Sequence, residues 1–312
     1  MNKKLLHMAS LAALVLSFGT AAQAAPLAKL GITVGSLGNP YFVAAAKGAA
    51  AEAKKLNPKV QVTTTASDYD LNKQFTQMDN FVAAGDSLIL LNAADPVAIL
   101  PAVKKAQAAH VPVVAFDVAA QGANATIMTD NVRAGYIACQ YMAKRLKGKG
   151  NVVIINGPQV SAVTDRVKGC KQVLAKNPGL KLLSDNLDAK GSRDGGFAMM
   201  QGLLTRFPHI DGVFGINDPT SIGAELAAKQ LHRSEMIIVS VDGSPDIEQA
   251  LKAKGSLIVA DATQDPYTMA ARAVAMGNKL LQGKKLAHKV VLMQPHLITA
   301  ANVAQYKGWT SH

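Results

Sequence analysis

Amide and carboxyl side chains stand beside a proline at four places, and each place follows a short apolar run: Asn39-Pro40, Asn92-Ala93-Ala94-Asp95-Pro96, Asn217-Asp218-Pro219 and Gln264-Asp265-Pro266. Each could start a helix, because Asn or Asp caps a helix N-terminus and proline suits the first helical position. Each could also bind a ligand, because an amide offers both donors and acceptors. The two roles are compatible if Asp95, Asp218 or Asp265 caps while Asn92, Asn217 or Gln264 faces a cleft.

Two further carboxylates, Asp117 in VVAFD and Asp242 in VSVDG, end apolar runs in the same way. A carboxylate accepts hydrogen bonds from neighbouring hydroxyl groups, and a guanidinium such as that of Arg166 supplies a rigid fork of donors. The alternative for Arg166 is a solvated ion pair with Asp165 or another acid.

Two aromatic residues, Tyr41 and Phe42, follow Asn39 at the start of a predicted helix. There an aromatic face could stack on the C–H face of a sugar ring, although ordinary core packing is the alternative for both rings. Acids, amides, a guanidinium and aromatic rings together suit a neutral ligand that carries many hydroxyl groups.

The elements that must position these residues alternate regularly between short apolar runs and longer segments of helical period. This alternation is typical of parallel α/β architecture, in which ligands bind at the carboxyl ends of the strands. Eleven strands are too many for one sheet of five or six strands, so we predict two α/β lobes with the ligand in the cleft between them. The predicted strands span residues 28–35, 59–65, 86–91, 111–116, 125–129, 151–156, 180–186, 211–216, 236–241, 257–262 and 289–292.

The first 24 residues have the pattern of a signal peptide: Lys3 and Lys4, an apolar run over 11–18, and a small-residue end at Ala22-Gln23-Ala24. We therefore expect export to the periplasm and a mature chain that begins at Ala25. No later apolar run approaches the roughly 20 residues that a membrane span needs. The 33 Lys and Arg residues outnumber 21 Asp and Glu, but they are spread along the chain, so we expect no nucleic-acid partner.

Eight segments together resemble the periplasmic ribose-binding type of sugar-binding protein, and the resemblance covers residues 28 to 300 in the same order. They are GSLGNPYF (35–42), LLNAADP (90–96), VVAFD (113–117), TDNVRAG (129–135), DRVKG (165–169), FGINDP (214–219), VSVDGSPD (239–246) and QDPYTMA (264–270).

The resemblance implies two doubly wound parallel-sheet lobes joined by a hinge of three crossings. It places the N-terminal lobe at 25–129 plus about 265–292, and the C-terminal lobe at 130–264 plus about 293–312. It also implies a monomer without a cofactor that delivers one sugar to the membrane permease of an ABC importer and, in some members, signals to a chemoreceptor. The ligand contacts that it implies are Asn39, Tyr41, Phe42, Asn92, Asp117, Arg166, Asn217, Asp242 and Gln264.

Two departures from the ribose-binding pattern argue against ribose itself. That pattern has an arginine after the strand-ending aspartate, whereas this chain has Val118 after Asp117. It also has an aromatic residue in the stretch that matches 189–192, where this chain has none. Another pentose, a hexose, a linear sugar alcohol or a cyclitol is therefore expected, and the residues do not distinguish a ring from an open chain.

Two other functions compete with sugar capture. An exported carbohydrate-processing enzyme could use Asp117 and Asp242 as acid and base, but we find no nucleophile elbow, zinc-binding or phosphate-binding motif. A sugar-responsive regulator of the lac-repressor type shares the two-lobed core, but it needs a DNA-binding module where this chain has the predicted signal peptide.

The two cysteines, Cys139 and Cys170, lie on predicted helices of the second lobe. An oxidising periplasm favours a disulfide. Successive helices of a doubly wound sheet tend to lie on opposite faces when the chain reverses direction, which disfavours one. The sequence leaves this pairing open.

Overall fold

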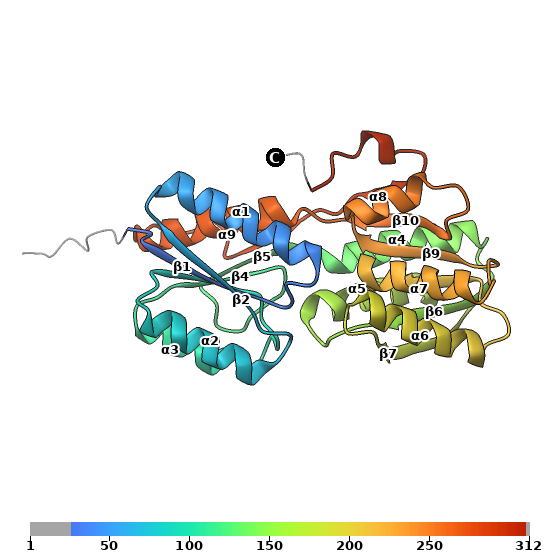
Figure 1. Cartoon of the computed structure of the whole chain (residues 1–312), viewed down its shortest axis with the longest axis horizontal. Coiled ribbons are helices and arrows are strands. Elements are labelled where there is room, and N and C mark those ends of the chain that lie inside the picture. Colours follow the sequence, from blue (N-terminus) through green and yellow to red (C-terminus); the bar gives the residue numbers. More distant parts are fainter. Residues whose placement is uncertain (1–25, 310–312) are drawn as a thin grey trace, which may run out of the picture.

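The computed structural model describes residues 26–309, so the predicted signal peptide, residues 1–24, lies outside the described residues. These residues form two lobes side by side, each built on a six-stranded sheet with helices on both faces (Figure 1).

The first sheet is entirely parallel and has the strand order β11-β5-β4-β3-β1-β2. Helices α1 (Pro40–Leu56) and α9 (Pro266–Leu281) cover one face, and α2 (Leu71–Ala83) and α3 (Leu100–Ala108) cover the other. The strands are fully buried where β3 and β4 cross the centre of the lobe. Their bounds are β1 (Lys29–Val34), β2 (Gln61–Ala66), β3 (Leu88–Leu91), β4 (Val113–Phe116), β5 (Ala125–Thr129) and β11 (Val290–Met293).

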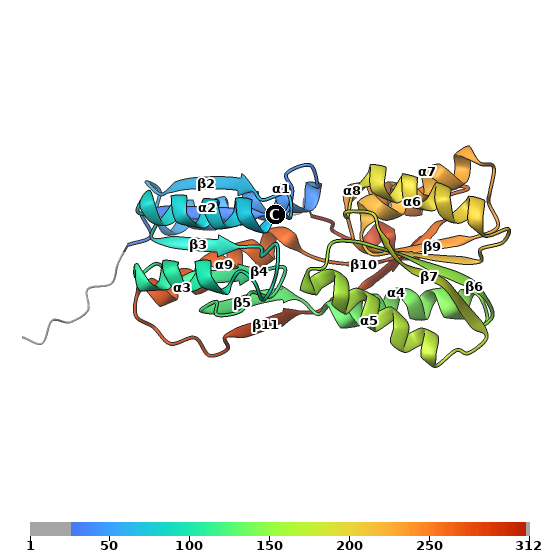
Figure 2. The same cartoon turned by 90° about the horizontal axis from the view of Figure 1, so that it is seen from below.

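The second sheet has the order β12-β10-β9-β8-β6-β7, and it is parallel except for its edge strand β12. One face is covered by α4 (Asn131–Arg145) and α5 (Ser161–Ala175), as Figure 2 shows. The other face is covered by α6 (Arg193–Arg206), α7 (Asp218–Gln230) and α8 (Pro245–Lys252). The strands are β6 (Gly150–Asn156), β7 (Leu180–Asp188), β8 (Gly212–Gly215), β9 (Ile237–Asp242), β10 (Ile258–Thr263) and β12 (Leu297–Thr299).

Both sheets therefore have the 2-1-3-4-5 strand order of a doubly wound fold, with one added edge strand, and the predicted fold class is confirmed. All eleven predicted strands are present, with ends that differ by at most two residues. The prediction missed β12, because three residues are too few to show a strand pattern.

The chain passes between the sheets three times: from β5 to α4, from β10 to α9 and from β11 to β12. The first two passages are joined by a hydrogen bond of 2.7 Å from Thr129 Oγ1 to Gln264 Oε1. Across the cleft, the Ala119 amide donates to Ser161 Oγ at 2.7 Å, and one buried apolar cluster runs from the first lobe into the second. The structure is thus a closed form of the two lobes.

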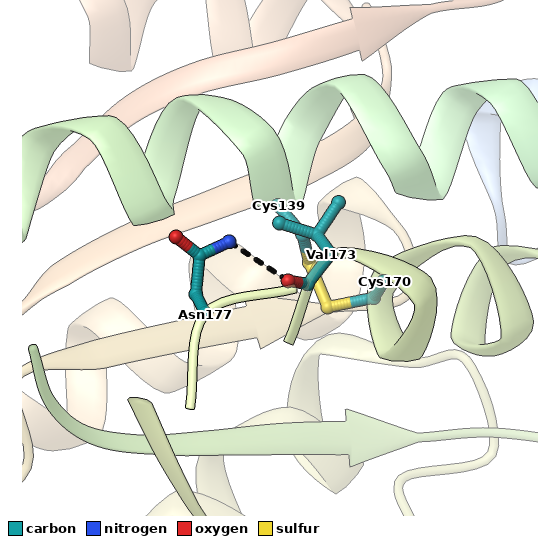
Figure 3. The surroundings of a disulfide bond; sticks show 4 residues. All are labelled: Cys139, Cys170, Val173 and Asn177. Carbon is teal, nitrogen blue, oxygen red and sulfur yellow. Dashed lines mark hydrogen bonds between the residues drawn. A yellow bond between two sulfur atoms is a disulfide. The ribbon is translucent and has the colours of Figure 1, made fainter. Parts of the chain in front are cut away.

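A disulfide joins Cys139 of α4 to Cys170 of α5, with the two Cα atoms 5.1 Å apart (Figure 3). The pairing is possible because α4 enters from the first lobe and lies on the same face of the second sheet as α5. The helices approach closely at Gly135, where an added Cβ would lie 1.9 Å from the Arg166 carbonyl oxygen. The open question of the cysteines is settled in favour of the disulfide.

Candidate ligand-binding site

A cavity lies between the lobes, at the carboxyl ends of strands from both sheets. This is where doubly wound sheets bind ligands, because the strand order reverses there and the loops diverge. The structure brings all nine sequence-predicted residues to the wall of this one cavity: Asn39, Tyr41, Phe42, Asn92, Asp117, Arg166, Asn217, Asp242 and Gln264.

Asp117 follows β4 directly and has a left-handed backbone with φ of 65°, which turns its carboxylate into the cavity. Asn92, at the end of β3, donates from Nδ2 to Asp117 Oδ2 at 2.8 Å, whereas the Tyr41 hydroxyl bonds to Met269 Sδ at 3.6 Å. Burial raises the pKa of Asp117, while Arg166, Tyr41 and Asn92 lower it. The first lobe thus presents a buried carboxylate held by the Asn92 amide.

Asp242 follows β9 and takes the corresponding place in the second lobe, also with a positive φ, of 145°. Its Oδ1 accepts from Arg166 Nη1 at 3.2 Å and from Gln264 Nε2 at 2.7 Å. Burial raises the pKa of Asp242 to about 8, against the lowering effect of Arg166. Charge and donors are therefore concentrated where the two lobes meet.

Arg166 is buried, with 4% of its surface exposed, so the alternative of a solvated ion pair is wrong. Its Nε donates to Asn131 Oδ1 at 2.8 Å and its Nη1 to the Ile216 carbonyl at 2.8 Å. These bonds fix the guanidinium plane beside Asp242, which is the requirement for a directional donor to a ligand.

At the four strand-to-helix junctions, the residue that caps the helix is not always the one that we expected. Asp265 does cap α9, through a bond of 2.9 Å from the Thr268 amide, and Asp95 accepts from the amides that follow it. In α7, however, the cap is Asn217, whose Oδ1 accepts from the Thr220 amide at 3.1 Å. Asn39 likewise caps α1 while lining the cavity.

Asp218, expected as a possible cap, is instead fully buried behind the cavity, so that expectation is wrong. It accepts from Ser240 Oγ at 2.8 Å and from the Ser244 amide at 2.7 Å. The carboxyl of Asp261 lies close enough to raise the pKa of Asp218, and neither of its buried oxygens has a hydrogen-bond partner among the described residues. Burial raises the pKa of both acids, that of Asp261 to about 7.

Sequence reasoning missed the apolar wall of the cavity and one aromatic residue. Tyr69 follows β2, and its ring packs on Gly35, where an added Cβ would lie 2.7 Å from ring carbons. Its hydroxyl faces Gly191 of the second lobe, at 4.0 Å from a Cβ built there. The position of Tyr69 after a strand could have marked it, since Asn92, Asp117 and Asp242 also lie at strand ends. The remaining wall residues are Val118, Pro158, Val160, Ala162, Val163 and Ile216.

The cavity thus combines a polar edge of two acids, amides and a guanidinium with an apolar wall. Such a site can bind hydroxyl groups on one side of a small molecule and C–H groups on the other. Within residues 26–309, no helix is both long and apolar enough to cross a bilayer, and no three or more His, Cys, Asp or Glu side chains are grouped to hold a metal ion.

Comparison with known proteins places this architecture in a family. The family described as "Periplasmic binding protein domain" matches residues 30–285. The ribose import binding protein of Escherichia coli (strain K12) is 32% identical over 290 residues, which are 92% of this chain and 95% of that protein. The D-apiose import binding protein of Paraburkholderia graminis is 32% identical over 302 residues, 95% of each chain.

A solved ABC transporter solute-binding protein from Bacillus halodurans C-125, with bound myo-inositol, has the same fold with a TM-score of 0.83. Its sequence identity is 22%, and the match covers 92% of this chain and 99% of that one. The chain therefore belongs to the periplasmic binding protein family, as a type I sugar-binding protein of the ribose-binding kind.

Proposed function

We propose that this protein captures one small neutral polyhydroxylated compound in the cavity between its lobes and delivers it to the permease of an ABC importer. The observation that carries the proposal is the convergence of Asp117 and Asp242, from strand ends of the two lobes, and Arg166, from helix α5, on one buried cavity. All nine predicted residues are proposed as ligand contacts, and Tyr69 is added to them.

The ligand class follows from the chemistry of the wall. Two carboxylates and one guanidinium leave little net charge for an ionic ligand to balance, whereas vicinal hydroxyls can donate to the acids and accept from Arg166. Val118, which is 1% exposed, lines the cavity directly after Asp117, so that position offers an apolar surface instead of a cation. We infer a pentose other than ribose, a hexose, an alditol or a cyclitol.

Capture is proposed to occur by closure of the lobes about the three passages between them. A ligand that bonds to Asp117 of one lobe and Asp242 of the other interacts fully only with the closed form, so it shifts the population towards that form. The permease then distinguishes loaded from empty protein by the relative position of the lobes. We also propose export to the periplasm with cleavage after Ala24, and action as a monomer.

A thermal-shift screen tests this function. The mature protein is unfolded and refolded to remove any carried-over ligand, and then melted with ribose, D-apiose, D-allose, xylitol, glycerol and myo-inositol. A compound at about 100 times its Kd adds about 2.7 kcal/mol of stability, which raises the melting temperature by several degrees. We expect compounds of one chemical class to raise the melting temperature, and we expect the protein to leave them chemically unchanged. Absence of a shift with every compound, or turnover of the bound compound, would contradict the proposal.

A further inference from the structure

The C-terminal segment crosses from the second lobe to the back of the binding site. After β12 and the short 3-10 helix η1 (Val303–Gln305), both in the second lobe, it returns towards the first lobe (Figure 1). Trp309 ends this path and is 6% exposed, inside the apolar cluster that contains α1 and α9 of the first lobe. A residue from the tail of the second lobe is thus part of the core of the first.

Trp309 bonds to the backbone of two proposed ligand residues at once. Its Nε1 hydrogen is shared between the carbonyl oxygens of Asp242 and Gln264, each at 3.1 Å from the nitrogen. The side chains of the same two residues bond to each other, from Gln264 Nε2 to Asp242 Oδ1 at 2.7 Å. The indole therefore holds the backbones of a pair whose side chains form the polar edge of the cavity.

The ring of Trp309 contacts a third ligand residue, this time from the first lobe. It lies edge-on to Tyr41, with centroids 5.7 Å apart and an angle of 80° between the rings. Tyr41 lines the cavity together with Asp117 and lies close enough to lower the pKa of that carboxyl. Trp309 thus contacts proposed ligand residues of both lobes.

The segment before Trp309 contacts the residues that follow Asp242, which fixes the position of the indole. Tyr306 donates its hydroxyl hydrogen to the Gly243 carbonyl at 3.0 Å, and Val303 is buried in the second-lobe core. Gly308 has φ of 66°, and an added Cβ there would lie 2.4 Å from a Glu248 carboxylate oxygen. Glycine adopts this left-handed turn without strain, and the turn places Trp309 behind the site.

We propose that Trp309 is a positioning residue for ligand capture, holding Asp242, Gln264 and Tyr41 in their binding arrangement from behind the cavity. This inference rests on the proposed function and adds to it a residue that does not line the cavity. Because Trp309 is the single tryptophan of the chain, its fluorescence reports the state of this contact directly.

The test compares variants of the refolded mature protein. Trp309→Phe keeps a ring against Tyr41 but removes the N–H donor, and Trp309→Ala removes both. A chain that ends at Trp309 controls for shortening the terminus. Leu27→Ala controls for lost stability, because Leu27 is 3% exposed in the same apolar cluster but does not line the cavity.

Calorimetry with whichever of ribose, D-apiose, D-allose, xylitol, glycerol and myo-inositol binds the wild type gives the Kd of each variant. Loss of one hydrogen bond predicts a Kd raised about threefold in Trp309→Phe, and added loss of the ring contact predicts about tenfold or more in Trp309→Ala. Titration of the wild type with this ligand should change the tryptophan emission, and the Kd fitted to that change should equal the calorimetric Kd. A purely structural residue would show no such change. Unchanged Kd in Trp309→Ala, or an equal loss in Leu27→Ala, would overturn the inference.

If none of the six compounds binds the wild type, the proposed function fails, and hydrogen exchange of the ligand-free protein tests Trp309 by itself. The Gln264 amide donates to the Asp242 carbonyl at 2.8 Å, beside the indole bond. Faster exchange of peptides over 240–266 in Trp309→Phe than in the wild type would support the positioning role. Equal exchange would refute it.

Discussion

Replacing Asp117 by asparagine should weaken ligand binding without weakening the fold. The carboxylate is 5% exposed, and burial raises its pKa. An amide has the same shape, so the bond from Asn92 Nδ2, now 2.8 Å long, can be kept by pointing the amide oxygen at it. The amide NH₂ group then faces the cavity in place of an acceptor oxygen.

The expected loss follows from this exchange of acceptor for donor. A hydrogen bond to a charged group contributes about 1.5–3 kcal/mol, and one such bond from a ligand hydroxyl is lost. Asp117→Asn should therefore raise the Kd about 10- to 150-fold. The melting temperature of the ligand-free protein should stay constant or rise at pH 7, because the amide removes a buried group whose ionised form burial disfavours.

Calorimetric titration and thermal unfolding of the same samples measure both effects. The matched control is Asp86→Asn, which neutralises another carboxyl of the first lobe. Asp86 is 6% exposed, burial raises its pKa, and it does not line the cavity. Asp86→Asn should therefore leave the Kd for the ligand unchanged.

The reasoning would be refuted if Asp117→Asn bound as tightly as the wild type. It would also be refuted if Asp86→Asn weakened binding to the same extent, because the effect would then belong to the lobe and not to the site.

Three further predictions concern charge, cross-linking and pH. Arg166→Met leaves the buried acceptors Asn131 Oδ1, the Ile216 carbonyl and Asp242 Oδ1 without their donor, so it should abolish measurable binding and lower the free energy of unfolding by about 3 kcal/mol or more in denaturant titrations; near wild-type stability would contradict these bonds. Replacing both Cys139 and Cys170 by alanine opens a link between residues 31 apart, which should cost about 3–4 kcal/mol of stability and leave the Kd unchanged, and a weaker Kd would show coupling to the site. The stability contributed by Asp242 and Asp261, whose folded pKa values lie near 8 and 7, is fully present below about pH 4 and is lost as the pH rises through those values. Calorimetric melting of the ligand-free protein should therefore give a lower melting temperature at pH 8.5 than at pH 5.5, and the opposite order would contradict these pKa directions.

Much of the site could be predicted because strand ends are visible in sequence. Asp117 and Asp242 each close an apolar run, and parallel pairing must bring such ends to one edge of a sheet. Asn92 and Asn217 are marked in the same way by the prolines that follow them. The local sequence pattern was therefore enough to predict that these residues line the cavity.

Other features depend on tertiary contacts that no local pattern shows. Asn217, and not Asp218, caps α7, because hydrogen bonds from Ser240 and Ser244 hold the Asp218 side chain in the core. The disulfide depends on α4 and α5 sharing one face, which follows from where α4 enters the second lobe. Trp309 is 45 residues beyond Gln264, and only the path of the C-terminal segment brings the two together.

The most direct test of polyol capture is calorimetric titration of the refolded wild type with the compound that the screen selects and with its monodeoxy analogues. A cavity built around Asp117, Asp242 and Arg166 should bind the parent compound with a single site per chain. It should bind an analogue that lacks a contacted hydroxyl at least about tenfold more weakly, because a buried partner is left unpaired. Equal affinity for every analogue, or no binding of any polyhydroxylated compound by the folded protein, would contradict the account.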